Sequence, residues 1–479
     1  MNPVVAPHLP YRPTEARLVI RGRLTLRVRA GEHHAAVPSL ADIRRRGFVA
    51  AGGLDGGPID SALRQRSAAV QVGRLFDPAQ RTLAGATGWD DIERELGLDR
   101  TFQVDLDPTS SLPDTLAALR DLDVVEVASA CFLCQAPFGW GGAGRGDPSV
   151  FDRVGATRAL MMEPGDSALI VGVVDSGVSR QHPELIRALR PGADVVDLDA
   201  ERLSRGLKLM GDTSARDREP DDDVGHGTAT MSIIGARGLH VHPGIGGAAR
   251  LLPLRAMARA LREGARDATA VGSLADIDTA VKLAVDLGAR VLNLSFGTPA
   301  SALGPDDPIP HEAVVRYAAA RGCVLVAASG NSGLEERYYP AALPEVLAVG
   351  AVDGMARPSS FTTRGEHVLL CAPGERIPTA GIEGYQECSG TSFAAPFVAG
   401  AVALLLARAN RNSTPVTPEE IRHLLATTAS PFPTDTTAQG CGSGVLDLPA
   451  ALRALDEATP GARPPPPLAP LWPTPAAPL

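Results

Sequence analysis

Hydrophobic and polar positions change their spacing several times along the chain, and each change predicts a different element. Residues 168–174 are a continuous apolar run, typical of a strand buried on both faces of a sheet. Residues 277–287 have the spacing of an amphipathic helix, which leads into another apolar strand at 290–297. The apolar run 397–407 predicts a buried helix. This part of the chain therefore combines apolar strands with helices.

The first 140 residues show a different pattern. Residues 23–29 and 102–106 alternate between apolar and polar side chains, as half-buried strands do. Residues 89–96 and 112–119 predict helices, and residues 124–127 predict a closing strand. This mixture indicates a smaller α+β domain.

Composition sets the limits of these domains. Residues 136–149 contain the sequence GWGGAGRG, which predicts an exposed glycine-rich linker between an N-terminal domain at 1–135 and a second domain at 150–458. Residues 459–479 are rich in proline and almost free of charge, so we expect a disordered, extended tail. The uncharged run 388–407 contains Ser, Gly, Thr and Pro, which favours a helix of the fold over a membrane span.

Charge and cysteine content exclude some functions. The 479 residues carry a net charge of -9, which argues against a nucleic-acid partner. The N-terminus lacks the charged start and apolar segment of a secretory signal, so we expect a cytoplasmic protein, or a secreted one if the true start lies elsewhere. The six cysteines include one Cys-x-x-Cys, Cys131 and Cys134, whereas a zinc site needs a second pair. We therefore expect no metal site and reduced thiols.

A serine among small residues marks the start of the apolar helix. Residues 389–396 have the sequence SGTSFAAP, in which Ser392 precedes the run 397–407. Small neighbours leave the hydroxyl open to an incoming carbonyl, and a helix N-terminus favours developing negative charge. Ser392 is thus a candidate nucleophile, although a helix of small residues packed closely on a sheet would have a similar sequence.

A nucleophilic serine needs a base and a group that orients the base. Asp175 follows the strand 168–174, at the end where open α/β sheets form their crevices, and is the candidate orienting carboxylate. His226 lies between two glycines on the first turn of a predicted helix and is the candidate base. Taken singly, Asp175 could be a turn residue and His226 a cap or core residue. Together with Ser392 they form a Ser-His-Asp set.

The chain order Asp, His, Ser is that of subtilisin, and from about residue 150 to about 455 the chain resembles a subtilisin-like serine protease (subtilase). The matching motifs are FDRVGA at 151–156, HPEL at 182–185, LNLSFG at 292–297, AASGN at 327–331 and the stretch 340–352. The resemblance implies a three-layer α/β catalytic domain with a mainly parallel sheet. It also implies an endopeptidase that hydrolyses protein or peptide substrates through an acyl-enzyme and requires no cofactor.

The resemblance also assigns residues around the triad. Asn331 matches the family's oxyanion asparagine, and a side-chain amide at a strand end can meet a developing oxyanion with a fixed donor; the alternative is a turn asparagine. The segments that border the substrate cleft in the family match Ser295, Phe296 and Gly297, and Ala328, Ser329 and Gly330.

The resemblance implies that the loop at 334–339, LEERYY, forms the floor of the specificity pocket. Small wall residues and a tyrosine floor favour a medium-sized apolar side chain before the scissile bond. Glu335 or Glu336, if turned inward, would instead attract Lys or Arg. A solvated charge cluster with Arg337 is the more ordinary interpretation.

One departure from the family concerns calcium. The loop 236–248 occupies the position of the family's calcium loop, yet it contains no Asn or Asp, and Glu184 stands where an aspartate is usual. Calcium takes six to eight oxygen ligands. The ligand-poor loop therefore does not support a structural calcium site.

The N-terminal domain ends in a helix and a strand at 112–127 that are similar to the end of subtilase propeptides. We therefore expect it to pack on the catalytic domain, to place 128–137 in the cleft and to inhibit the enzyme intramolecularly. A permanent accessory domain is the alternative.

Two other functions compete with an active subtilase. A catalytically silent subtilase fold that serves as a binding or regulatory module would lack a triad member, and none is missing. The acid-acting sedolisin type uses a glutamate base, against which His226 argues.

Overall fold

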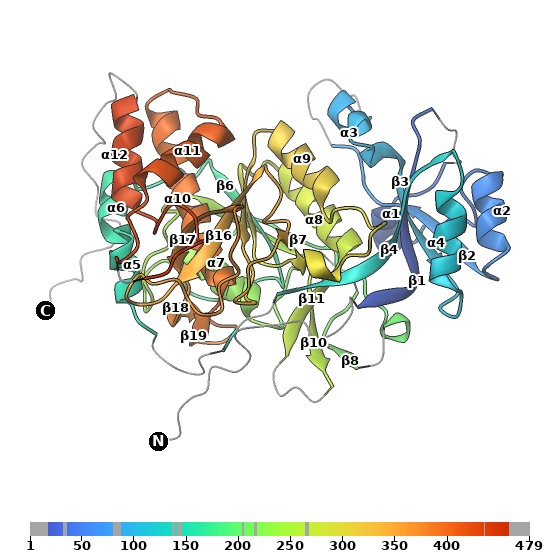
Figure 1. Ribbon diagram of the computed structural model, residues 1–479, viewed down its shortest axis with the longest axis horizontal. Coiled ribbons are helices and arrows are strands. Elements are labelled where there is room, and N and C mark those ends of the chain that lie inside the picture. Colours follow the sequence, from blue (N-terminus) through green and yellow to red (C-terminus); the bar gives the residue numbers. More distant parts are fainter. Residues whose placement is uncertain are drawn as a thin grey trace, which may run out of the picture.

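The computed structural model describes residues 18–31, 36–79, 88–136, 139–140, 146–203, 206–214, 218–263, 268–434 and 436–458. The predicted tail at 459–479 and residues 137–138 and 141–145 of the predicted linker lie outside these ranges. The N-terminal elements, at the blue end of the colour scale, lie to one side of the larger part of the protein (Figure 1).

A seven-stranded sheet forms the centre of the larger part. Its strand order is β17-β16-β14-β12-β6-β9-β7, and every neighbouring pair is parallel. Its strands are almost entirely buried, which explains their continuous apolar sequences. The strands are β6 (Ile170–Asp175), β7 (Ala193–Asp194), β9 (Arg250–Arg255), β12 (Val291–Leu294), β14 (Val324–Ala328), β16 (Val346–Val352) and β17 (Val368–Pro373).

Helices cover this sheet and complete the predicted α/β fold. Two of them, α7 (His226–Gly235) and α10 (Thr391–Arg411), pack on each other and on the central strands, while α8 (Leu274–Asp286) and α9 (Glu312–Ala320) form a second pair. By length and composition, α10 could cross a membrane, but its most apolar window is completely buried inside the protein. It is the central helix of the core. The outer helices are α5 (Ser149–Arg153), α6 (Ala156–Met162), α11 (Pro418–Thr428) and α12 (Leu448–Ala458).

The N-terminal elements form an antiparallel sheet in the order β2-β3-β1-β4. Helix α4 packs on β1 and β4, and these elements share a hydrophobic core that includes Leu24, Phe102 and Leu116 and is separate from the main core. The elements are β1 (Val19–Val28), α1 (Leu40–Arg46), α2 (Pro58–Arg64), β2 (Val70–Arg74), α3 (Asp91–Glu95), η1 (Leu98–Arg100), β3 (Thr101–Leu106), α4 (Leu112–Arg120) and β4 (Val125–Ala136).

Strand β4 connects the two parts of the protein. Its residues up to Ala130 belong to the N-terminal core, and those from Cys131 onward belong to the main core. Beyond β4 the antiparallel sheet continues through β11 (Thr269–Ser273) to β10 (Ala258–Arg262) and β8 (Leu207–Met210).

The segment expected to be an exposed linker is partly structured. It begins inside β4 and contains β5 (Gly139–Trp140), which pairs with β19 (Tyr385–Ser389). The sequence predicted a strand ending at residue 127, because its apolar alternation fades in the small residues that follow. Pairing with β1 as far as Phe132, and then with β11 over residues 133–136, extends the strand beyond what local propensity indicates. The remaining short elements are η2 (Ala200–Arg202), β13 (Thr298–Pro299), η3 (Ala300–Ala302), β15 (Tyr338–Tyr339) and β18 (Ile377–Ala380).

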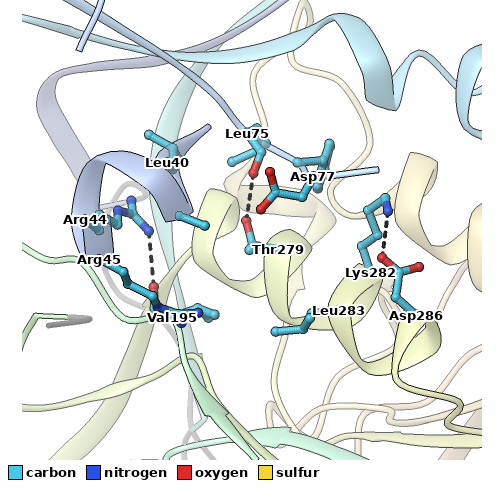
Figure 2. Close-up of a pocket in the computed structure, with 12 residues that line it drawn as sticks. Leu40, Arg44, Arg45, Leu75, Asp77, Val195, Thr279, Lys282, Leu283 and Asp286 are labelled. Atoms are coloured by element: carbon cyan, nitrogen blue, oxygen red, sulfur yellow. Dashed lines mark hydrogen bonds and ion pairs between the residues drawn. The ribbon is translucent and has the colours of Figure 1, made fainter. Parts of the chain in front are cut away.

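A pocket lies at the seam between the two parts, where α1 and the end of β2 meet α8 (Figure 2). Leu75, from the N-terminal part, accepts a long hydrogen bond of 3.5 Å through its carbonyl from the Thr279 hydroxyl. Lys282 and Asp286 form an ion pair of 2.7 Å on the other wall. None of the candidate catalytic residues lines this pocket.

Candidate active site

Asp175 and His226 meet at the carboxyl end of the central sheet. Asp175 is the last residue of β6, and His226 is the first residue of α7, after Gly225 in a left-handed conformation with φ 93°. His226 Nδ1 lies 2.7 Å from Asp175 Oδ1, and both residues are completely buried. With Nδ1–H donating to the carboxylate, a neutral ring carries its basic lone pair on Nε2.

A second carboxylate, Asp222, organises the same turn. Its Oδ1 accepts hydrogen bonds from the Val224 and Gly225 amides and from the Ser176 hydroxyl, at 2.8–3.0 Å. Its Oδ2 accepts from the amide and the hydroxyl of Thr228, at 2.9 and 2.6 Å. Asp222 thus satisfies donors at the N-terminus of α7 and fixes the helix turn that carries the histidine.

Ser392 is the second residue of α10 and is tied to the end of β12. Its hydroxyl donates to the Ser295 carbonyl at 3.1 Å, while the Ser295 hydroxyl donates to the Ser392 carbonyl at 2.8 Å. The second bond has a local cause: Pro396 has no N–H to donate to the carbonyl four residues earlier. The ring of Phe393 lies 5.3 Å from that of His226, so the N-termini of α10 and α7 are neighbours.

Asn331 follows β14 and faces the same helix N-terminus. The Thr391 amide and hydroxyl both donate to its Oδ1, at 2.8 and 2.9 Å. Because a backbone N–H can only donate, this contact determines which atom of the Asn331 side chain is the oxygen. Its Nδ2 lies 3.4 Å from the position that a Cβ on Gly390 would occupy. An amide donor is therefore placed beside the backbone just before Ser392.

The two segments expected to border the cleft lie on either side of Tyr338. A Cβ on Gly297 would lie 2.5 Å from Tyr338 Cε1, and a Cβ on Gly330 would lie 3.0 Å from Tyr338 Cγ. Glu335 is exposed, and Glu336 accepts a hydrogen bond of 3.4 Å from the exposed Ser301. This arrangement favours the tyrosine floor over an inward-facing acid.

The described residues on either side of 137–138 pair with segments close to Ser392. The Gln135 carbonyl accepts a hydrogen bond of 3.2 Å from the Gly297 amide, and residues 133–136 pair with β11 on their other side. Just after residues 137–138, which lie outside the described part of the chain, Gly139 pairs with Ser389. The backbone on both sides of residues 137–138 is thus held by the segments that surround Ser392.

Glu184 closes the loop that was expected to be poor in calcium ligands. Its completely buried carboxylate accepts hydrogen bonds of 2.7–3.0 Å from the amides of Gly238, Leu239 and His240. The loop therefore presents N–H donors to an anion here, the opposite of what a cation needs. Among the described residues, no group of three or more His, Cys, Asp or Glu side chains could hold a metal ion.

Two of these features were missed in the sequence. Asp222 gave no local cue, because it stands three residues before the N-cap Gly225, outside the positions of a helix-start signal. Glu184 could not have been given its partners, because they lie more than 50 residues away.

Residues 166–444 match the model of the subtilase family. The thermophilic serine proteinase of Bacillus sp. (strain AK1) is 35% identical over 269 residues, which are 55% of this chain and 57% of that protein. Thermitase of Thermoactinomyces vulgaris is 32% identical over 254 residues, 53% of this chain and 80% of thermitase. The chain thus spans little more than half the length of the first of these relatives.

Two solved structures resemble the fold. The prenylagaramide maturation protease PagA superposes with a TM-score of 0.50 at 27% identity, over 63% of this chain and 98% of that one. A lanthipeptide protease superposes with a TM-score of 0.51 at 21% identity, over 64% of this chain and 94% of that one. The second likeness concerns the fold alone.

Proposed function

Because the chain belongs to the subtilase family, we propose that it is a serine endopeptidase that hydrolyses protein or peptide substrates. The observation that carries this proposal is the buried 2.7 Å hydrogen bond between Asp175 and His226, next to the helix N-terminus that bears Ser392. All three side chains that acyl transfer needs are present, which argues against a catalytically silent module. A histidine paired with a carboxylate also argues against a glutamate-based mechanism.

In the proposed reaction, the Ser392 hydroxyl attacks the scissile carbonyl while His226 Nε2 takes its proton. Asp175 keeps the proton on Nδ1 and stabilises the imidazolium that forms. The Asn331 side-chain amide and the Ser392 backbone amide hold the oxyanion. His226 then protonates the leaving amine, and water releases the acyl group from Ser392 by the same steps in reverse.

The test is a single substitution. Ser392→Ala should abolish hydrolysis of peptide substrates and labelling by a fluorophosphonate, because both need the nucleophilic hydroxyl. Circular dichroism and the melting temperature should change little, because the change removes one oxygen atom. Full labelling of the variant would overturn the nucleophile assignment.

We further infer that the N-terminal part inhibits this site and is cut from it. Two contacts support this: residues 133–136 of β4 lie between β11 and Gly297, which belongs to a segment expected to border the substrate cleft, and the next described residue, Gly139, pairs with Ser389. One of the three peptide bonds between Ala136 and Gly139 is therefore the expected site of self-cleavage. Intact-mass analysis should find new ends in this interval for the wild type and a full-length chain for Ser392→Ala. An active protein that remains uncut would indicate a permanent accessory domain.

The proposed chemistry requires no cofactor. The family's calcium loop does not fit calcium here, since Glu184 and three backbone amides satisfy one another at that position. We propose that this carboxylate closes the loop in place of a metal.

A further inference from the structure

A buried polar cluster connects strand β4 to the larger part of the protein, outside the proposed triad. Cys134 Sγ lies 3.1 Å from the Thr298 hydroxyl and 3.5 Å from His311 Nε2. His311 Nδ1 in turn lies 2.6 Å from Asp278 Oδ1. The cysteine, threonine and histidine are each no more than 4% exposed.

The position of Cys134 is set by the pairing of β4 on both of its sides. Its backbone pairs with Gly272 of β11, and the next residue, Gln135, pairs with Gly297. Successive side chains of a strand point to opposite faces. A peptide that replaced β4 in this register would therefore present one side chain to Thr298 and His311, immediately before the residue that pairs with Gly297.

The charge of this cluster follows from its contacts. Burial alone would lower the pKa of His311, but the Asp278 carboxylate and Cys134 outweigh burial and raise the pKa to about 10. The ring is thus protonated at neutral pH, with Nδ1–H bound to Asp278 and Nε2–H directed at the thiol. A buried donor on a charged ring is costly to leave without an acceptor.

We propose that His311 and Thr298 form a polar specificity subsite that accepts a short substrate side chain ending in a thiol or hydroxyl. The subsite lies one residue before the substrate position that pairs with Gly297. The proposal rests on the proposed function, because it describes what the same cleft selects. An apolar side chain there would leave the imidazolium and the hydroxyl unpaired, whereas a long one would have to displace them.

The test uses peptides with the chain's own sequence from residue 130 to 142, in which Cys134 is kept or replaced by Ser, Val or Leu. The processed enzyme should cleave the Cys and Ser peptides with kcat/KM about tenfold or more above the Val and Leu peptides, which corresponds to one hydrogen bond to a charged group. His311→Leu should remove most of this preference, and Thr298→Val should reduce it. His423→Leu, at an exposed histidine on α11, should leave it unchanged.

Equal or faster cleavage of the Leu peptide by the wild type, or the same preference in the His311→Leu variant, would overturn the subsite. No cleavage of any peptide would instead count against the proposed function. A second measurement does not depend on catalysis: in the full-length Ser392→Ala protein, Cys134→Ser should keep the melting temperature and the near-isosteric Cys134→Val should lower it. A Val variant as stable as the Ser variant would contradict the proposal.

Discussion

Asp222 should affect both stability and turnover, although it takes no direct part in the proposed chemistry. Its carboxylate accepts five hydrogen bonds at the turn that carries His226. Asp222→Ala would leave these buried donors without an acceptor, at a cost of about 3 kcal/mol or more. We expect the melting temperature to fall by about 6–12 °C and kcat by at least about tenfold, because the histidine loses its fixed position.

The neighbouring acid provides a matched control for Asp222. Asp221 is exposed and pairs with Arg180 at 2.6 Å. Exposed ion pairs contribute little to stability, so Asp221→Ala should change the free energy of unfolding by less than about 1 kcal/mol. An equal effect of the two substitutions, measured by thermal unfolding in the Ser392→Ala background, would contradict the role assigned to Asp222.

His311 should make the stability of the protein depend on pH. Its pKa is about 10 in the folded protein, above the ordinary 6.5, so the folded state binds the proton more tightly. A raised pKa contributes stability that is complete below pH 6.5 and is lost as the pH rises through about 10. In the Ser392→Ala background, the melting temperature of His311→Gln should lie below that of its parent at pH 6.5, and the gap should narrow toward pH 10. A gap that is independent of pH would mean that the ring is neutral.

At the scale of elements, the loop after α7 should depend on Glu184 rather than on calcium. Three loop amides converge on this carboxylate, and the Tyr385 hydroxyl adds a fourth donor at 3.3 Å. Glu184→Gln removes the charge and turns an NH₂ group toward N–H donors, which should cost about 2–3 kcal/mol. Millimolar calcium should not restore the lost melting temperature, and a chelator should barely change that of the wild type. Glu383→Gln, on an exposed loop, is the control.

A large drop in melting temperature on adding the chelator, reversed by calcium, would contradict this account of the loop.

The sequence predicts elements well where one residue pattern decides them. The apolar run of β6 and the small-residue start of α10 locate Asp175 and Ser392 correctly at the ends of their elements. Strand β4 was predicted nine residues too short, because the missed residues are held by pairing with β1 as far as Phe132 and with β11 and Gly297 beyond it. No local pattern encodes partners so distant in sequence. For the same reason, the contact between Cys134 and His311 could not be predicted, because these residues are 177 positions apart.

For the molecule as a whole, the seam between the N-terminal part and the larger part is lined by ion pairs. Arg44 of α1 pairs with the buried Asp276 at 3.1 Å, and Lys282 of α8 pairs with the buried Glu93 of α3 at 2.7 Å. Arg321 also contacts Asp90. Removing one partner of a buried ion pair leaves the other charge buried and uncompensated. Docking of the N-terminal part on the larger part therefore depends on both partners of each pair being present. We therefore expect the N-terminal part to stay associated with the larger part after cleavage, held by these ion pairs.

Lys282 and Lys208 are the only lysines in the chain, and they allow a matched test of this docking. Lys282 is 2% exposed and also lies 5.1 Å from the centre of the Tyr317 ring, whereas Lys208 is exposed on β8. Lys282→Met would leave the Glu93 carboxylate buried without its ion-pair partner, which should destabilise the docked state by about 3–5 kcal/mol. The dissociated state should be destabilised much less, because Glu93 is then solvated. After self-cleavage, the N-terminal fragment of this variant should separate from the rest on gel filtration and peptide hydrolysis should rise, while Lys208→Met should behave like wild type. Co-elution as tight as in the wild type would mean that strand β4, and not the seam, holds the fragment in place.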